Sequence, residues 1–163
     1  EIIRECPWAT TGRVGMRRPN IITSLELRSE EMEVINLRIQ AKYREIEEKE
    51  VRYEEFMLDD AEYAIVAFGS AARIAKKSIE IARGQGIKVG LLRPITLWPF
   101  PSAKIAELSG KVRGILSLEI NAGQMVEDIM LAAGGNAPVR HFGRLGGIIP
   151  DPDEVVEALK NMF

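Results

Sequence analysis

Apolar residues in the second half of the chain are grouped into short runs that alternate with helix-like segments. Three clear runs and one weaker run have the length of a strand: 63–68, 87–92, 115–120 and 139–142. Near-continuous apolar strands separated by helices are typical of a parallel sheet buried on both faces, because right-handed crossovers place helices above and below it. The pattern therefore predicts an α/β domain.

The segments between these runs have recognisable helix ends. Helices are predicted from Ser70 to the glycines at 84 and 86, from Ser102 to Gly110, from about Gly123 to Gly134, and after Asp151. Glycine commonly ends a helix because it adopts a left-handed backbone conformation at little cost. The last helix starts with Asp-Pro-Asp-Glu, which supplies an N-cap, a first-turn proline and a reciprocal acid.

The first 60 residues have a different character. Residues 1–28 mix turn-formers with arginines and show no period, so we interpret them as a linker from an upstream domain. Residues 29–60 are predicted to form a helix that starts at Ser29, followed by an edge strand over 51–56. The apolar stripe of this helix, with spacings of 3 and 4, fits either a coiled-coil seam or packing against a neighbouring domain. Residues 61–163 form the predicted α/β domain.

Composition limits the possible functions. A chain of 163 residues with 46% hydrophobic and 28% charged residues is globular and has room for one ordinary domain. The net charge of -2 argues against nucleic-acid and membrane partners, and no apolar run is long enough to cross a bilayer. One cysteine, Cys6, excludes an internal disulfide and any iron-sulfur cluster held by this chain alone. We expect a cytoplasmic protein, and the acidic start without Met suggests a fragment of a larger chain.

Two glycine-containing segments are candidate anion sites. Ligands of open parallel sheets bind beyond the carboxyl ends of the strands, and Gly69 and Ser70 follow the first run there. Arg144, with Gly146 and Gly147, follows the last run. Both segments offer main-chain amides to an anion, but neither matches a phosphate-binding glycine motif. A tight turn with a helix cap, and a flexible connection, explain them equally well.

Polar residues also follow the third run. Glu119 ends an apolar strand, where a carboxylate must be paired or exposed, and Asn121 and Gln124 come directly after it. They are candidates for hydrogen bonding at a functional surface or for holding the loop and a subunit contact together. His141, the one histidine, has no carboxylate or nucleophile near it in the sequence, so we interpret it as structural. We assign no catalytic residue and no metal site.

A stiff aromatic loop follows the second run. Residues 93–101 contain three prolines around Trp98 and Phe100. Exposed aromatic side chains on a rigid segment are typical of interfaces. The alternative is that both aromatic rings fold back over the edge of the sheet.

These loops resemble a known family. The sequences KVGLLRPITLWPFP at 88–101, LEINAGQMVEDI at 118–129 and FGRLGG at 142–147 are similar to the carboxyl-terminal domain of thiamine-dependent 2-oxoacid:ferredoxin oxidoreductases. The resemblance extends from Pro7 to the end and is greatest to the 3-methyl-2-oxobutanoate (ketoisovalerate) type. Ala122 stands where many members carry Met. The resemblance marks Glu119, Asn121, Gly123, Gln124 and Met125 as a functional or assembly loop.

The resemblance implies a fold and a set of partners. The fold is the transketolase C-terminal type, a three-layer α/β/α sandwich whose mostly parallel five-stranded sheet has one antiparallel edge strand, which would be 51–56. The missing upstream domain would bind the pyrimidine of thiamine diphosphate. Other subunits would supply the diphosphate and magnesium site and the iron-sulfur clusters, and this chain itself would hold no cofactor.

The resulting hypothesis is an assembly and docking domain that is inactive as an isolated fragment. The parent enzyme would decarboxylate a 2-oxoacid, transfer the acyl group to coenzyme A and pass electrons to ferredoxin. One alternative is a stand-alone anion- or nucleotide-binding module that uses Gly69, Ser70 and Arg144. Another is the equivalent domain of a different thiamine enzyme, such as transketolase or the pyruvate dehydrogenase beta subunit.

Overall fold

The computed structural model describes residues 21 and 23–162, and most of the predicted linker and Cys6 lie outside the described residues. Five helices and five strands are present in the described part of the chain. In chain order they are α1 (Ser29–Lys49), β1 (Tyr53–Phe56), β2 (Tyr63–Val66), α2 (Gly69–Gly84), β3 (Val89–Pro94), α3 (Ser102–Ser109), β4 (Gly114–Glu119), α4 (Met125–Ala133), β5 (Val139–Gly143) and α5 (Pro152–Met162).

The strands form one mixed sheet in the order β1-β3-β2-β4-β5. The pairs β2/β3, β2/β4 and β4/β5 are parallel, with Tyr63 opposite Val89 in the first of them. β1 is antiparallel to β3 and lies at the edge, with Tyr53 opposite Pro94. The predicted fold class, including the antiparallel edge strand, is confirmed.

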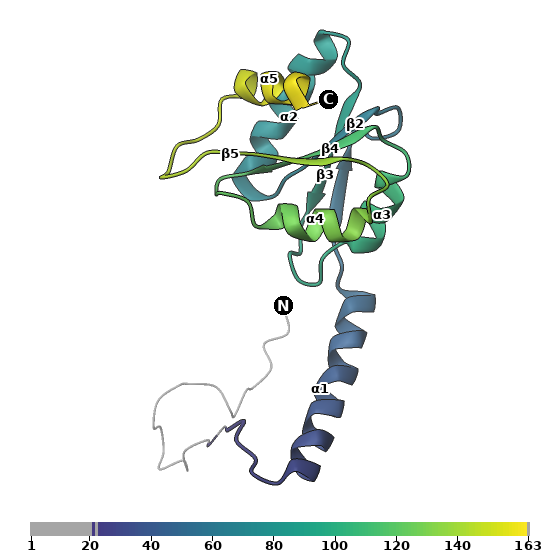
Figure 1. Ribbon diagram of the computed structural model, residues 1–163, viewed down its shortest axis with the longest axis vertical. Coiled ribbons are helices and arrows are strands. Elements are labelled where there is room, and N and C mark those ends of the chain that lie inside the picture. Colours follow the sequence, from purple (N-terminus) through teal and green to yellow (C-terminus); the bar gives the residue numbers. More distant parts are fainter. Residues whose placement is uncertain (1–20, 22, 163) are drawn as a thin grey trace, which may run out of the picture. The chain divides into compact units, whose positions relative to one another are not determined.

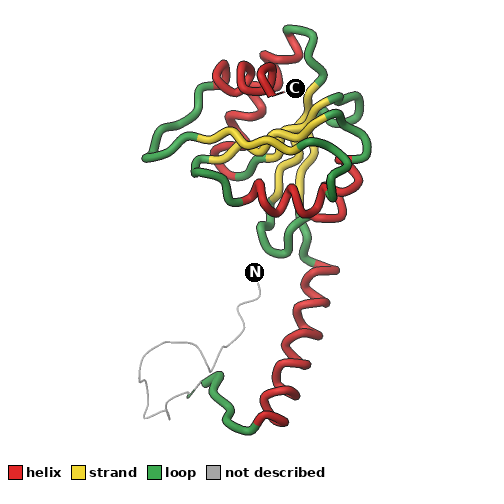
Figure 2. The backbone as a smooth tube through the Cα atoms, in the orientation of Figure 1, coloured by secondary structure: helices red, strands yellow, loops and turns green. Residues whose placement is uncertain are grey.

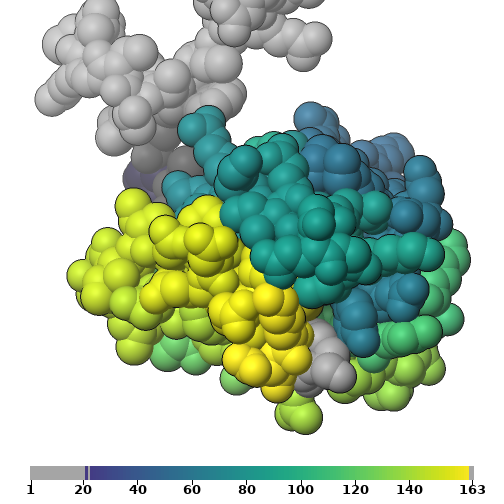
Figure 3. All heavy atoms as spheres, turned by 90° about the horizontal axis from the view of Figure 1, so that it is seen from above, coloured from purple at the N-terminus to yellow at the C-terminus, as the bar shows by residue number. Residues whose placement is uncertain are grey.

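Helices cover both faces of the sheet, as Figures 1 and 2 show. α2 and α5 pack against each other on one face, and α3 and α4 pack against each other on the other. Successive strand residues point to opposite faces, so Ile65 joins the core under α2 and α5, whereas Ala64 and Val66 join the core under α3 and α4. In Figure 3, α5 in yellow and the yellow-green segment before it lie together on one side of this part of the chain.

The helix ends agree with the sequence patterns in part. Asp151 Oδ1 accepts a hydrogen bond from the Asp153 main-chain N–H at 2.9 Å, and Glu154 accepts one from the Asp151 N–H at 3.1 Å, so the reciprocal cap of α5 is formed. The helix predicted from Ser70 is α2, which begins one residue earlier, at Gly69 with φ of 56°, and has no side-chain cap.

β3 begins two residues later than the pattern predicts. The Ile87 main-chain N–H donates to the Ala82 carbonyl at 3.0 Å, and the Gly86 N–H donates to the Arg83 carbonyl at 3.0 Å. With φ of 83° at Gly86, this is the glycine-dependent cap that ends α2. Ile87 belongs to this turn and is not free to pair in the sheet.

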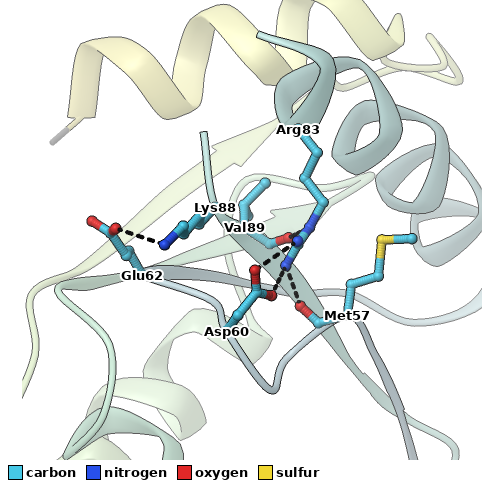
Figure 4. Close-up of polar contacts among 6 residues, drawn as sticks. All are labelled: Met57, Asp60, Glu62, Arg83, Lys88 and Val89. Atoms are coloured by element: carbon cyan, nitrogen blue, oxygen red, sulfur yellow. Dashed lines mark hydrogen bonds and ion pairs between the residues drawn. The ribbon is translucent and has the colours of Figure 1, made fainter. Parts of the chain in front are cut away.

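Arg83 joins the end of α2 to the sheet (Figure 4). Its guanidinium donates to the Val89 carbonyl at 2.8 Å, to the Met57 carbonyl at 2.7 Å and to the Asp60 carboxylate at 2.6 Å. The backbone at Met57 passes so close to β3 that a Cβ on Gly90 would lie 2.4 Å from the Met57 oxygen. Glycine is required at this close approach.

The chain divides into two compact units, 1–41 and 42–163. In the described part of the first unit, α1 carries Glu30 and Glu31 in its first turn and no buried residue. The helix continues into the second unit, where Lys49 pairs with Glu45 at 2.7 Å. The domain boundaries predicted at residues 28 and 60 remain predictions.

Candidate functional site

The carboxyl ends of β2, β3 and β4 meet at one edge of the sheet. From β2 the chain passes through α2 to β3 on one side, whereas from β4 it passes through α4 to β5 on the other side. This change of direction between β2 and β4 is where open α/β sheets bind ligands. The Phe68–Ser70 turn and the 119–125 loop both lie at this point.

Glu119 organises the loop after β4. The residue is 1% exposed, and its Oε2 accepts hydrogen bonds from the main-chain N–H groups of Gln124 at 3.2 Å and Met125 at 2.9 Å. Its Oε1 accepts hydrogen bonds from the Val126 N–H at 3.0 Å and the Ser117 hydroxyl at 2.9 Å. The carboxylate at the end of β4 thus caps the first turn of α4, which satisfies donors that the helix cannot satisfy itself.

The electrostatics of Glu119 follow from these contacts. Burial acts to raise the pKa of this carboxyl group, but the hydrogen bonds from the Met125 N–H, the Ser117 hydroxyl and the Gln124 N–H outweigh burial and hold the pKa below the ordinary value for Glu. The positive end of α4 adds to the same preference for the charged form. Glu119 is therefore an ionised structural cap.

Asn121 and His141 complete the loop. Asn121 Oδ1 accepts a hydrogen bond from the Gly123 N–H at 2.7 Å, and Gly123 has φ of 104°. His141 on β5 places its Nδ1 3.5 Å from Glu119 Oε1, and this buried nitrogen has no hydrogen-bond partner. A Cβ on Gly143 would lie 2.4 Å from the Asn121 carbonyl oxygen, so the loop and β5 are in close contact.

The loop between β3 and α3 separates its two aromatic side chains. Trp98 is 55% exposed and packs edge-on against Tyr43 with ring centroids 5.4 Å apart. Phe100 is partly buried against the core under α3 and α4. Thr96 fixes the loop, because its hydroxyl donates to the Pro99 carbonyl at 2.9 Å and accepts from the Arg52 N–H at 3.0 Å.

A cavity of about 210 Å³ opens between the aromatic loop and the 119–125 loop. We call it the switch-point pocket, and its lining residues are Phe68, Leu97, Phe100, Glu119, Asn121, Gln124, Met125 and Asp128. Five of the predicted site residues are brought together here, whereas Trp98 and Gly123 are not among the lining residues. Sequence reasoning did not select Phe68, Leu97 or Asp128, although Asp128 lies about one helical turn after Met125 and therefore on the same side of α4.

One of the two candidate anion sites has its cation already paired within the chain. The Arg144 guanidinium lies 2.9 Å from Glu154 Oε1, the carboxylate that also caps α5. Gly146 and Gly147 have φ of 64° and 83° and form the turn that follows. Gly69 and Ser70 are exposed at the start of α2. Anion binding at these residues remains a prediction.

The described residues contain no group of three or more His, Cys, Asp or Glu side chains arranged to hold a metal ion. Iron-sulfur clusters need several cysteine thiolates, and the sequence has only Cys6, so this chain does not fit cluster binding by itself. None of the helices within the described residues is both long and apolar enough to cross a membrane.

Comparison with known proteins decides the family. Residues 61–155 match the sequence model of the pyruvate:ferredoxin oxidoreductase core domain II. The chain belongs to this family. The resemblance found in the three loop sequences is thereby confirmed, and core domain II is the part of the oxidoreductase that carries them.

Curated relatives are subunits of such oxidoreductases. The ketoisovalerate oxidoreductase subunit VorB of Methanothermobacter thermautotrophicus is 44% identical over 95% of this chain. The 2-oxoglutarate synthase subunit KorA of Methanothermobacter marburgensis is 33% identical over 64% of this chain. The chain spans 44% of the length of VorB and 28% of the length of KorA.

Solved structures share the fold of this core domain II. A 2-oxoglutarate:ferredoxin oxidoreductase from Magnetococcus marinus aligns with 83% of this chain and 24% of its own, with a TM-score of 0.71 and 18% identity. A split-gene transketolase aligns with 68% of this chain and 40% of its own, with a TM-score of 0.59 and 16% identity. These likenesses support the transketolase-like architecture.

Proposed function

We propose that this core domain II is an assembly and docking domain of a 2-oxoacid:ferredoxin oxidoreductase that acts on 3-methyl-2-oxobutanoate. The 44% identity to VorB over 95% of the chain supports the substrate type. In the parent enzyme, the 2-oxoacid is oxidatively decarboxylated, the acyl group is transferred to coenzyme A, and the electrons pass to ferredoxin. Thiamine diphosphate, magnesium, the iron-sulfur clusters and coenzyme A are bound by other parts of that enzyme.

The observation that carries the docking role is the exposed Trp98 side chain beside the switch-point pocket. Trp98 is 55% exposed on a loop whose neighbours Leu97 and Phe100 line that pocket. Ile95 and Leu97 are also exposed, at 54% and 47%. An apolar, rigidly held group of this kind is typical of the centre of a protein interface. The contact would hold the cofactor-binding parts in register.

The test is Trp98→Ala in the complete subunit that carries this domain. We expect the affinity for the other subunits to fall by about tenfold or more, as for a buried aromatic anchor, with the thermal unfolding temperature unchanged. Leu131→Ala is the matched control, because Leu131 is 83% exposed on α4 and away from the loop in sequence. Equal assembly of both variants with the other subunits would rule out this docking role.

The substrate type is tested separately on the assembled enzyme. We expect kcat/KM to be highest for 3-methyl-2-oxobutanoate when it is compared with pyruvate and 2-oxoglutarate. A preference for 2-oxoglutarate would contradict the assignment based on VorB and favour the one based on KorA. The docking role does not depend on this result.

A further inference from the structure

The size of the switch-point pocket limits what it can hold. Its volume of about 210 Å³ is below the range of about 300–1,000 Å³ found for small-molecule and cofactor sites. A space of this size suits a single large side chain. Since we propose that this surface docks another part of the oxidoreductase, the natural occupant is one side chain of that partner, and the inference rests on the proposed function.

The walls of the pocket are apolar and aromatic on one side. Phe68 comes from the end of β2, Leu97 and Phe100 come from the loop after β3, and Met125 from the first turn of α4 is 5% exposed. Such walls favour an aliphatic stem or a flat, weakly hydrated group over a compact, strongly hydrated ion.

The polar side of the pocket is acidic. Glu119 and Asp128 are carboxylates, Asn121 and Gln124 supply amides, and none of the lining residues is Lys, Arg or His. The charge of Glu119 is already met by the main-chain amides of α4. Asp128, by contrast, is exposed and has no ion pair or side-chain hydrogen bond among the described residues.

This combination selects one kind of side chain. Phosphates and carboxylates are repelled by the two acids, and a purely apolar side chain would leave Asp128 and the amides without partners. An arginine matches both sides, because its stem and guanidinium plane pack on aromatic rings while its N–H groups donate to carboxylate and amide oxygens. We propose that the switch-point pocket receives an arginine side chain from another subunit of the oxidoreductase.

The experiment uses the assembled oxidoreductase with substitutions in the complete subunit. We expect Asp128→Asn to raise the dissociation constant of the complex by about tenfold at low salt, and the effect to shrink strongly at about 1 M NaCl, where charges are screened. Asp128→Arg should weaken assembly further, because the new positive charge at the pocket would repel the incoming arginine. Glu127→Gln is the control, since Glu127 is an exposed acid in the same turn that does not line the pocket.

Competition with free arginine identifies the occupant. Arginine at high concentration should dissociate the wild-type complex more than citrulline, which has the same shape without the charge, and the difference should vanish in Asp128→Asn. Equal effects of arginine and citrulline on the wild type, or a change in self-association of the subunit alone, would overturn the proposal. If neither the Asp128 variants nor Trp98→Ala weaken the complex, the docking role itself fails. If Trp98→Ala weakens the complex and the Asp128 variants do not, the docking role stands and the arginine pocket does not.

Discussion

Replacing Glu119 by Gln keeps the shape of the side chain but removes the charge that caps α4. In wild type, the carboxylate accepts hydrogen bonds from three main-chain N–H groups and one hydroxyl while it is 1% exposed. A glutamine has one oxygen. If that oxygen replaces Oε2 and keeps the bonds from Gln124 and Met125, its amide group faces the Val126 N–H, which then has no acceptor.

The expected cost follows from that arrangement. A buried N–H without an acceptor costs about 1–3 kcal/mol, and each of the two remaining bonds loses the extra strength that an ionised acceptor gives, about 1 kcal/mol. We expect Glu119→Gln to lower the free energy of unfolding by about 3–5 kcal/mol at pH 7. Urea unfolding followed by circular dichroism measures this change. Glu127→Gln, an exposed acid in the same first turn, should cost less than about 1 kcal/mol.

The pH dependence gives a second check on the same side chain. Folding lowers the pKa of Glu119 below that of an unfolded glutamate, about 4.3. The contribution of its charge is therefore fully present above about pH 4.3 and is lost as the pH falls through the folded pKa. The difference in stability between wild type and Glu119→Gln should accordingly narrow below pH 4. A loss smaller than about 1 kcal/mol at pH 7, or a gap that stays constant down to pH 3, would refute the capping role.

Three further predictions concern other parts of the domain. Gly90→Ala should destabilise the fold by about 2 kcal/mol or more, because the new Cβ would lie 2.4 Å from the Met57 oxygen. The control is Gly110→Ala, which should change the free energy of unfolding by less than about 1 kcal/mol, because Gly110 has φ of -78° and the nearest atom to its new Cβ would be 3.6 Å away. Urea unfolding compares the two variants. Arg83→Lys should cost about 1–2 kcal/mol in the same assay, because an ammonium cannot reproduce the bonds to two carbonyls and a carboxylate. Calorimetry with phosphate, nucleotides and coenzyme A should detect no micromolar binding, because Arg144 is already paired; micromolar binding that Arg144→Ala abolishes would restore the anion-binding alternative.

The alternation of apolar runs and helices was enough to predict the α/β class because the central strands β2, β3 and β4 are buried on both faces and carry that burial in their own residues. The approximate strand positions followed, but the start of β3 did not. Ile87 is apolar like the strand residues Val89 and Leu91, and only the cap at the end of α2 removes its N–H from the sheet. Local hydrophobicity does not distinguish a strand residue from an apolar residue in a helix cap.

The site was predictable residue by residue but not as an arrangement. The pattern identified Glu119 as an acid that must be paired, yet its partners lie five to seven positions ahead and become available only when the chain turns into α4. Phe68 and Asp128 share a pocket because β2 and β4 are adjacent in the sheet. Strand order depends on crossovers and is not encoded in any short window, so these two residues were missed.

The two faces of the sheet are completed at different times as the chain is made. α3 and α4, which cover one face, are separated only by β4, whereas α2 must wait for α5, which comes after all five strands. During synthesis from the amino terminus, the apolar face of α2, which includes Ala75 and Ile79, has no helical partner until residues 152–162 have left the ribosome. This half of the core is therefore the one that a holdase chaperone would contact, and premature termination before α5 would give a product prone to aggregation rather than a smaller stable domain.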